Sequence, residues 1–132
     1  NQVLKQNIEK LEMMSIALSR SQSAPGDIDK QLHDVKTELQ LMRKQLSGDP
    51  MRNEVGEKSK PTIGGRVSVA AMGTRNSTYG PTATHKQSLK IAREQLDSLK
   101  NDLGNILNEK MPAIEQALID AKAPYIKGTE LR

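Results

Sequence analysis

Residues 28–46, IDKQLHDVKTELQLMRKQL, decide the fold of this chain. Their large apolar side chains follow one another in alternating steps of four and three: Ile28, Leu32, Val35, Leu39, Met42 and Leu46. This spacing is typical of an a/d seam, in which one face of a helix packs on other helices. The helix should end at Ser47–Pro50, because Gly48 can adopt the left-handed cap conformation and Pro50 cannot continue the hydrogen-bond ladder.

A first helix is predicted before this one, from near the start of the chain to about Arg20. Its apolar residues recur on one face: Leu4, Ile8, Leu11 and Leu18, with Met14 adding width. Residues 21–27, SQSAPGD, favour a turn, and Asp27 is placed to cap the second helix. Because the connection is short, we predict an antiparallel helical hairpin over 1–47.

Helical periodicity returns over residues 83–122. Thr84 with Gln87 matches a capping box at the start. One apolar seam follows, Leu89, Ala92, Leu96, Leu99, Leu103 and Ile106, and then a second set shifted by one position, Leu107, Met111, Ile114, Leu118 and Ala121. Pro112 lies near the join, so this region forms either one kinked helix or two helices, with residues 123–132 as a tail.

Between the second and third helical regions, residues 48–82 lack periodicity and are rich in glycine, with Pro61 among them. We predict a long irregular connection here, which by its length is either functional or disordered. Val67, Val69, Ala71 and Met72 suggest one short extended piece within it. The predicted fold is all-α, a single domain over 1–132 made of an antiparallel bundle of three to four helices with this connection between helices two and three.

The composition agrees with a helical bundle and excludes several functions. Of 132 residues 35% are hydrophobic, Phe, Trp and Cys are absent, and two tyrosines are the only aromatics. The 20 basic and 16 acidic side chains give a net charge of +4, which we interpret as a solvated surface. A nucleic-acid site would need clustered cations with aromatics, and only a thin run is present: Arg52, Lys58, Lys60, Arg66 and Arg75.

The sequence also bears on membranes and on processing. No apolar run approaches the length of a membrane span, about 18 residues. The chain opens at Asn1 without a methionine and already in helical register, so we expect an upstream region that has been removed.

No catalytic, cofactor-binding or metal site is predicted. His33 and His85 have no cysteine or histidine at ligand spacing, and we interpret them as solvated or local polar side chains. Carboxylate pairs such as Asp97 with Asp102 are common on helix surfaces and indicate no acid–base site. Gly64–Arg66 lacks the context of a phosphate-binding loop. An enzyme would need a pocket with convergent polar groups, which this sequence does not suggest.

Three stretches resemble a known family. They are Arg66, residues 73–96 (GTRNSTYGPTATHKQSLKIAREQL) and residues 111–128 (MPAIEQALIDAKAPYIKG). Together they are similar to the C-terminal helical region of exported BNR-repeat proteins, which are sortilin-type, glycosyl-hydrolase-like β-propellers. The family's Gly-Pro-Thr and Ala-Pro-aromatic elements match Gly80–Thr82 and Ala123–Tyr125, with tyrosine at Tyr125 where the family has tryptophan.

The resemblance implies a helical tail that follows β-propellers in an exported protein, periplasmic, on the cell surface or secreted. It implies interdomain packing by Arg66, Gly80, Pro81, Thr82, Pro124 and Tyr125. No Asp-box repeat lies in this chain, so no catalytic residue of the family carries over. The expected function is a non-catalytic accessory domain that packs against the propeller of the same polypeptide. The alternative is a free-standing coiled-coil adaptor or oligomerisation module, because heptads alone do not separate the two.

Overall fold

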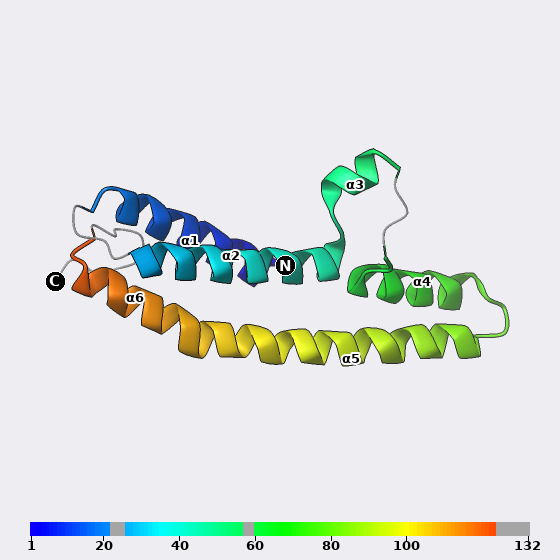
Figure 1. The fold of residues 1–132 in the computed structure, drawn as a ribbon. Coiled ribbons are helices and arrows are strands. Elements are labelled where there is room, and N and C mark those ends of the chain that lie inside the picture. The colour runs from blue at the N-terminus through cyan, green and yellow to red at the C-terminus, as the bar shows by residue number, and fades with distance from the viewer. Residues whose placement is uncertain (22–25, 57–59, 124–132) are drawn as a thin grey trace. The chain divides into compact units, whose positions relative to one another are not determined.

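A computed structural model describes residues 1–21, 26–56 and 60–123. These residues fold entirely into helices and turns, without a strand, and they confirm the predicted all-α helical bundle (Figure 1). The elements are α1 (Gln2–Ser19), α2 (Gly26–Ser47), α3 (Pro50–Glu54), α4 (Ile63–Asn76), α5 (Ala83–Asn105), the π-helical turn η1 (Ile106–Lys110) and α6 (Met111–Asp120). They form two compact units, and α2 and α5 contribute to both.

The first unit comprises Asn1–Leu41 and Leu103–Arg132, and its described part is built from α1, most of α2, η1 and α6. The seams predicted for these helices form its core. The buried side chains are Leu4, Ile8, Leu11, Met14, Ala17, Leu18, Ile28, Leu32, Val35, Leu39, Ile106, Met111, Ile114 and Leu118. Burying large aliphatic side chains of this kind contributes about 1.5–3 kcal/mol each before chain entropy is subtracted.

Polar contacts at the rim of this core fix how the helices run. Lys36 of α2 pairs with Glu12 of α1 at 2.9 Å, while the Oγ of Ser21 donates to the carbonyl of Ala121 at 3.2 Å. The first contact agrees with an antiparallel α1–α2 hairpin. The second joins the C-terminal ends of α1 and α6. Together with the ion pair between Lys10 of α1 and Glu115 of α6, it shows that these two helices run in the same direction.

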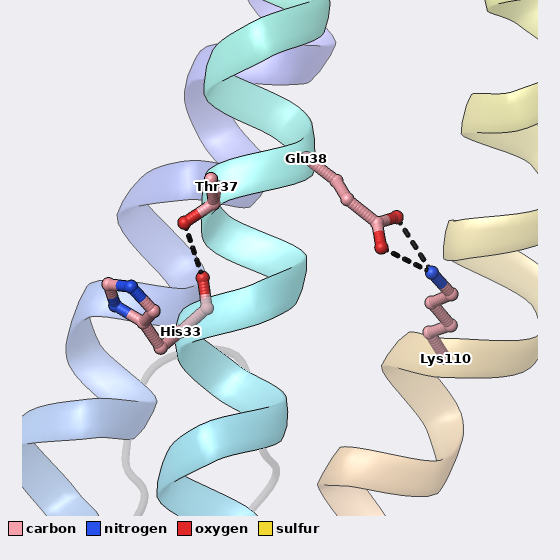
Figure 2. A network of polar contacts seen from close by, with 4 residues as sticks. All are labelled: His33, Thr37, Glu38 and Lys110. Carbon is pink, nitrogen blue, oxygen red and sulfur yellow. Dashed lines mark hydrogen bonds and ion pairs between the residues drawn. The ribbon is translucent and has the colours of Figure 1, made fainter.

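A salt bridge links α2 to η1 in the same unit. The Nζ of Lys110 lies 2.6 and 2.7 Å from the two carboxylate oxygens of Glu38 (Figure 2). On the other side of α2, Thr37 donates to the carbonyl of His33 at 2.9 Å, and the His33 ring points away from this ion pair. Both partners of the salt bridge are partly exposed, so it orients the helices more than it stabilises them.

The region around Pro112 is one continuous helical run with a π-helical turn, which answers the question that the sequence left open. The buried residues step from Ile106 to Met111, a spacing of five instead of four. A π turn accommodates one extra residue per turn. It therefore accounts for the shift of one position between the two apolar seams predicted from the sequence. Pro112 is the second residue of α6, which directly follows the π turn.

The second unit comprises Met42–Asp102, with the end of α2, α3, α4 and most of α5. The predicted stop at the end of α2 is confirmed: Gly48 has a φ of 84° and its amide donates to the carbonyl of Lys44. Asp49 then caps α3 by accepting from the amide of Met51 at 3.2 Å and pairing with Lys44 at 2.9 Å. The hydrogen bond from Lys44 is the main cause that lowers the pKa of Asp49.

The prediction of an irregular 48–82 segment with an extended piece over Val67–Met72 is wrong, because Ile63–Asn76 forms the helix α4. Its glycines lower helix propensity, and its apolar residues show no single face, so the sequence pattern missed it. Two features offset the cost. Thr62 caps the helix by accepting from the amide of Gly65 at 2.9 Å, and Gly64 lets the helix approach the end of α2. A Cβ at Gly64 would lie 2.9 Å from the carbonyl oxygen of Leu46.

Candidate interaction surface

Helix α4 exposes apolar side chains on the side opposite its buried contact. Ile63 and Ala70 are 5% and 0% exposed, whereas Val69 and Met72 are 59% and 63% exposed. Met72 follows Ala70 by two residues, which places it on nearly the opposite side of the helix. A helix that is apolar on several faces is usually covered on several faces. We call Val69 and Met72 the outer face of α4.

The inner side of α4 faces α5, and a glycine–histidine contact sets their register. The two helices run side by side (Figure 1), and a Cβ on Gly73 would overlap the imidazole of His85. That ring is itself held in place, because Thr82 accepts from the amide of His85 while the Nδ1 of His85 accepts from the amide of Thr82, both at 3.3 Å. This is a reciprocal capping box with histidine at the third position of the helix.

The predicted cap of α5, Thr84 with Gln87, is therefore wrong by two residues. The helix begins at Ala83, and the capping hydroxyl belongs to Thr82. The same proline–threonine pair precedes both helices, as Pro61–Thr62 before α4 and Pro81–Thr82 before α5. This repeated pair is the sequence signal that would have located both helix starts, because proline disfavours helix in the residue before it and threonine accepts from the first free amides.

One stripe of α5 is basic around a single leucine. Lys86, Leu89, Lys90 and Arg93 stand at positions i, i+3, i+4 and i+7, which share a helix face. All four are exposed, Leu89 to 44%. The carboxylate nearest to Lys90, that of Glu94, lies 4.0 Å away. The stripe is thus an apolar contact surrounded by cations.

A matching stripe of α4 lies on the same side of the hairpin. The contact between α4 and α5 is marked by Gly73 and His85. Val67 stands six residues before Gly73 and Leu89 four residues after His85, and both steps turn the side chain around its helix in the same sense from that contact. In an antiparallel pair, side chains displaced in the same sense from the contact line lie on the same side of the pair. Val67, which is 45% exposed, is therefore on the side of Leu89. We give the name basic edge to Val67, Ala71 and Arg75 of α4 with Lys86, Leu89, Lys90 and Arg93 of α5.

The charges of the chain are segregated more strongly than the overall balance suggests. Residues 60–93 contain six basic residues and no Asp or Glu, whereas the rest of the chain has 14 basic and 16 acidic residues, a net charge of −2. The net charge of +4, taken over the whole chain, does not reveal this block. A count of charge by window, instead of over the whole chain, would have found it.

Four of the six predicted packing residues lie in the second unit, close to this hairpin. Gly80 has a φ of 81°, which suits glycine, and Gly80–Thr82 form the turn that leads into α5. Arg66 is half-buried in the first turns of α4, and its Nε is buried without a hydrogen-bond partner among the described residues. Pro124 and Tyr125 lie outside the described residues.

The two histidines lie in different units of the chain. His33 is exposed beside a shallow groove between α1 and α2 in the first unit, lined by Leu11, Ser15, Gly26, Asp29, Lys30, Leu32, His33 and Lys36. His85 belongs to the α5 cap. Within residues 1–21, 26–56 and 60–123, no three His, Cys, Asp or Glu side chains gather as a metal site would require.

Two further findings concern membrane-spanning helices and related proteins. Among the helices of the described chain, none combines the length and the apolar character needed to cross a membrane. The resemblance of residues 61–128 to BNR-repeat proteins stays a prediction that rests on the residues quoted for it. Comparison with protein-family models, with curated proteins and with solved structures finds no match to this chain.

Proposed function

We propose that this chain is a non-catalytic helical accessory domain whose second unit packs against another domain of a larger, exported polypeptide. The observation behind the proposal is the exposed apolar surface of α4, where Val67, Val69 and Met72 are each more than two-fifths exposed. Apolar side chains gathered on one short helix are expected to mark a protein contact when they are not needed in the helix's own fold.

Other segments of the second unit also expose large side chains. Met51 and Val55 are 79% and 78% exposed, and Tyr79 in the α4–α5 connection is 99% exposed. The first unit also exposes large aliphatic side chains, among them Ile16, Leu41 and Ile119 at 52%, 55% and 64%, but it holds every one of the largest fully buried side chains of the described residues. A domain with one well-filled core and a second unit that buries smaller side chains suits a support whose second unit is covered by a neighbouring domain.

By the resemblance to BNR-repeat proteins, the neighbouring domain is a β-propeller of the same polypeptide. In this proposal the chain buries apolar surface against the propeller and helps to hold the propeller in position. Any reaction with a substrate takes place on the propeller. Gly80–Thr82 and Arg66, which resemble the family motif, lie in the hairpin that exposes the apolar side chains.

The alternative is an oligomerisation module, in which two copies cover each other's α4. The same exposed residues favour it, since a self-complementary apolar face closes a symmetric dimer. Light scattering after gel filtration separates the two proposals. A monomer over a wide concentration range supports the accessory domain, whereas a dimer that Met72→Lys dissociates supports oligomerisation.

A photo-crosslinking side chain at Met72, in the full polypeptide, identifies the neighbour directly. We expect adducts to peptides of another domain in the same polypeptide, mapped by mass spectrometry. A matched position is Gln40, which is exposed on α2 and carries no apolar surface, and it should give no such adduct. Adducts that join two copies of α4, or none beyond those of Gln40, would contradict the accessory-domain proposal.

A further inference from the structure

We propose that the basic edge is a docking site for an acidic protein surface, one in which Asp and Glu side chains surround a small apolar contact. The inference rests on the proposed function and names the chemistry of the partner. Val67 and Leu89, 45% and 44% exposed, form the apolar centre, and the cations of the basic edge form its rim. Interfaces with this arrangement gain affinity from the centre and orientation from the charged rim.

The cations of the basic edge are not neutralised within the described chain. Arg75, Lys86 and Arg93 form no ion pair among the described residues, and Lys90 is paired there with Glu94 alone, at 4.0 Å, with both side chains largely exposed. An ion pair between two largely exposed side chains is weak and does little to neutralise either charge. The positive potential of residues 60–93 is therefore free to act on an incoming partner.

Charge and side-chain type argue against other occupants. A second copy would bring the same four cations of the basic edge against these, and like charges across an interface weaken association. Nucleic acid binding without base readout uses stacked aromatics, and residues 60–93 contain only Tyr79, which lies in the connection between the helices. A membrane surface suits a wide stripe of bulky apolar residues, while the basic edge offers only Val67 and Leu89 as large ones.

A designed acidic peptide provides the probe. It is helical, with leucines at i, i+4 and i+7 and glutamates elsewhere, and its counterpart carries lysine in place of each glutamate. We expect the acidic peptide to bind the whole chain in fluorescence anisotropy, with amide shifts in NMR spectra concentrated on α4 and α5. Affinity should fall about tenfold from low to high salt, and the lysine peptide should not bind.

Matched variants locate the site on the chain. Lys86→Gln combined with Arg93→Gln should weaken binding about tenfold, and Leu89→Ser should weaken it by a similar factor. Lys100→Gln removes an exposed cation from the same helix outside the basic edge and should change the affinity less than about twofold. Circular dichroism checks that each variant keeps the helix content of the parent chain.

Two results would overturn the inference. One is an acidic peptide that does not bind, or that binds Lys86→Gln/Arg93→Gln as well as the parent. The other is a single-stranded oligonucleotide, or vesicles of phosphatidylcholine with phosphatidylserine, that binds more tightly with the same footprint. If Met72 crosslinks to another domain but these charges prove irrelevant, the accessory-domain proposal survives and only the acidic partner is lost.

Discussion

The two units of this chain bury different kinds of side chain. In the described residues, every one of the largest fully buried side chains lies in the first unit: Leu4, Leu11, Met14, Leu39, Ile106, Ile114 and Leu118. The second unit buries Met42, Ile63, Ala70, Ala92 and Leu99, and Gly73 of α4 stands against the ring of His85 of α5, with no room for a Cβ.

The difference has an energetic consequence. Burial scales with apolar area, so long aliphatic side chains stabilise the first unit more per residue than alanine and glycine stabilise the second. Small residues do allow α4 and α5 to approach closely, but they leave the medium-sized apolar side chains of α4 outside the contact. We infer that the first unit is the stable scaffold and that the second is the surface offered to a partner.

The largest expected effect comes from the core of the first unit. Leu39 is fully buried, so Leu39→Ala should lower the free energy of unfolding by about 2–5 kcal/mol in urea denaturation. Leu41, two residues later on the same helix, is 55% exposed, and Leu41→Ala should change the free energy of unfolding by less than about 0.5 kcal/mol. Equal losses from the two variants would show that the first unit is not packed as described.

A smaller effect tests the close contact of the second unit. Gly73→Ala raises helix propensity by about 1 kcal/mol, yet its Cβ would overlap the His85 ring and disturb the α5 cap. We expect a net loss of about 1–2 kcal/mol from this crowding. In a His85→Ala background, Gly73→Ala should instead stabilise the protein, because the imidazole that its Cβ would overlap is absent. Thermal denaturation of the four proteins measures the coupling, and additive effects would rule out the Gly73–His85 contact.

The cap of α5 gives a prediction of similar size with its own control. Thr82→Ala removes the hydroxyl that accepts from the amide of His85 and should cost about 1 kcal/mol, with faster amide exchange in the first turn of α5. Thr82→Ser should retain most of the stability. Thr84→Ala, at the position favoured by sequence alone, should have a smaller effect; if it has the larger one, the helix begins where the sequence placed it.

The smallest expected effect is a pH dependence at the start of α3. The pKa of Asp49 lies below its ordinary value of 3.8, chiefly because of the hydrogen bond from Lys44. A lowered native pKa means that the carboxylate stabilises the fold above about pH 4 and that this contribution is lost as the pH falls through the native pKa. Melting temperatures of the parent and Asp49→Asn should therefore differ slightly at pH 7 and converge as the pH falls below the native pKa of Asp49. A gap that widens in acid would contradict the Lys44 pairing.

Part of this organisation was predictable from the sequence, and the reasons differ by region. The seams from Leu4 to Leu18 and from Ile28 to Leu46 predicted α1 and α2 closely, because amphipathic periodicity reports directly on which face is buried. The shift between Ile106 and Met111 was visible as a change of register, although the sequence did not show that a π turn would absorb it. The block of charge over residues 60–93 was also present in the sequence and was overlooked.

The sequence by itself determined the helical class, the two core-forming seams and the charge of each segment, since these depend on local spacing and composition. Only the tertiary structure decided that Ile63–Asn76 is a helix and that its apolar side chains are left exposed. The physical reason is that a glycine-rich segment has weak local preferences, so its conformation is set by what it packs against: the carbonyl of Leu46 and the ring of His85. Contacts between residues distant in the chain decided this part of the fold, and with it the surface that we propose as the site of binding.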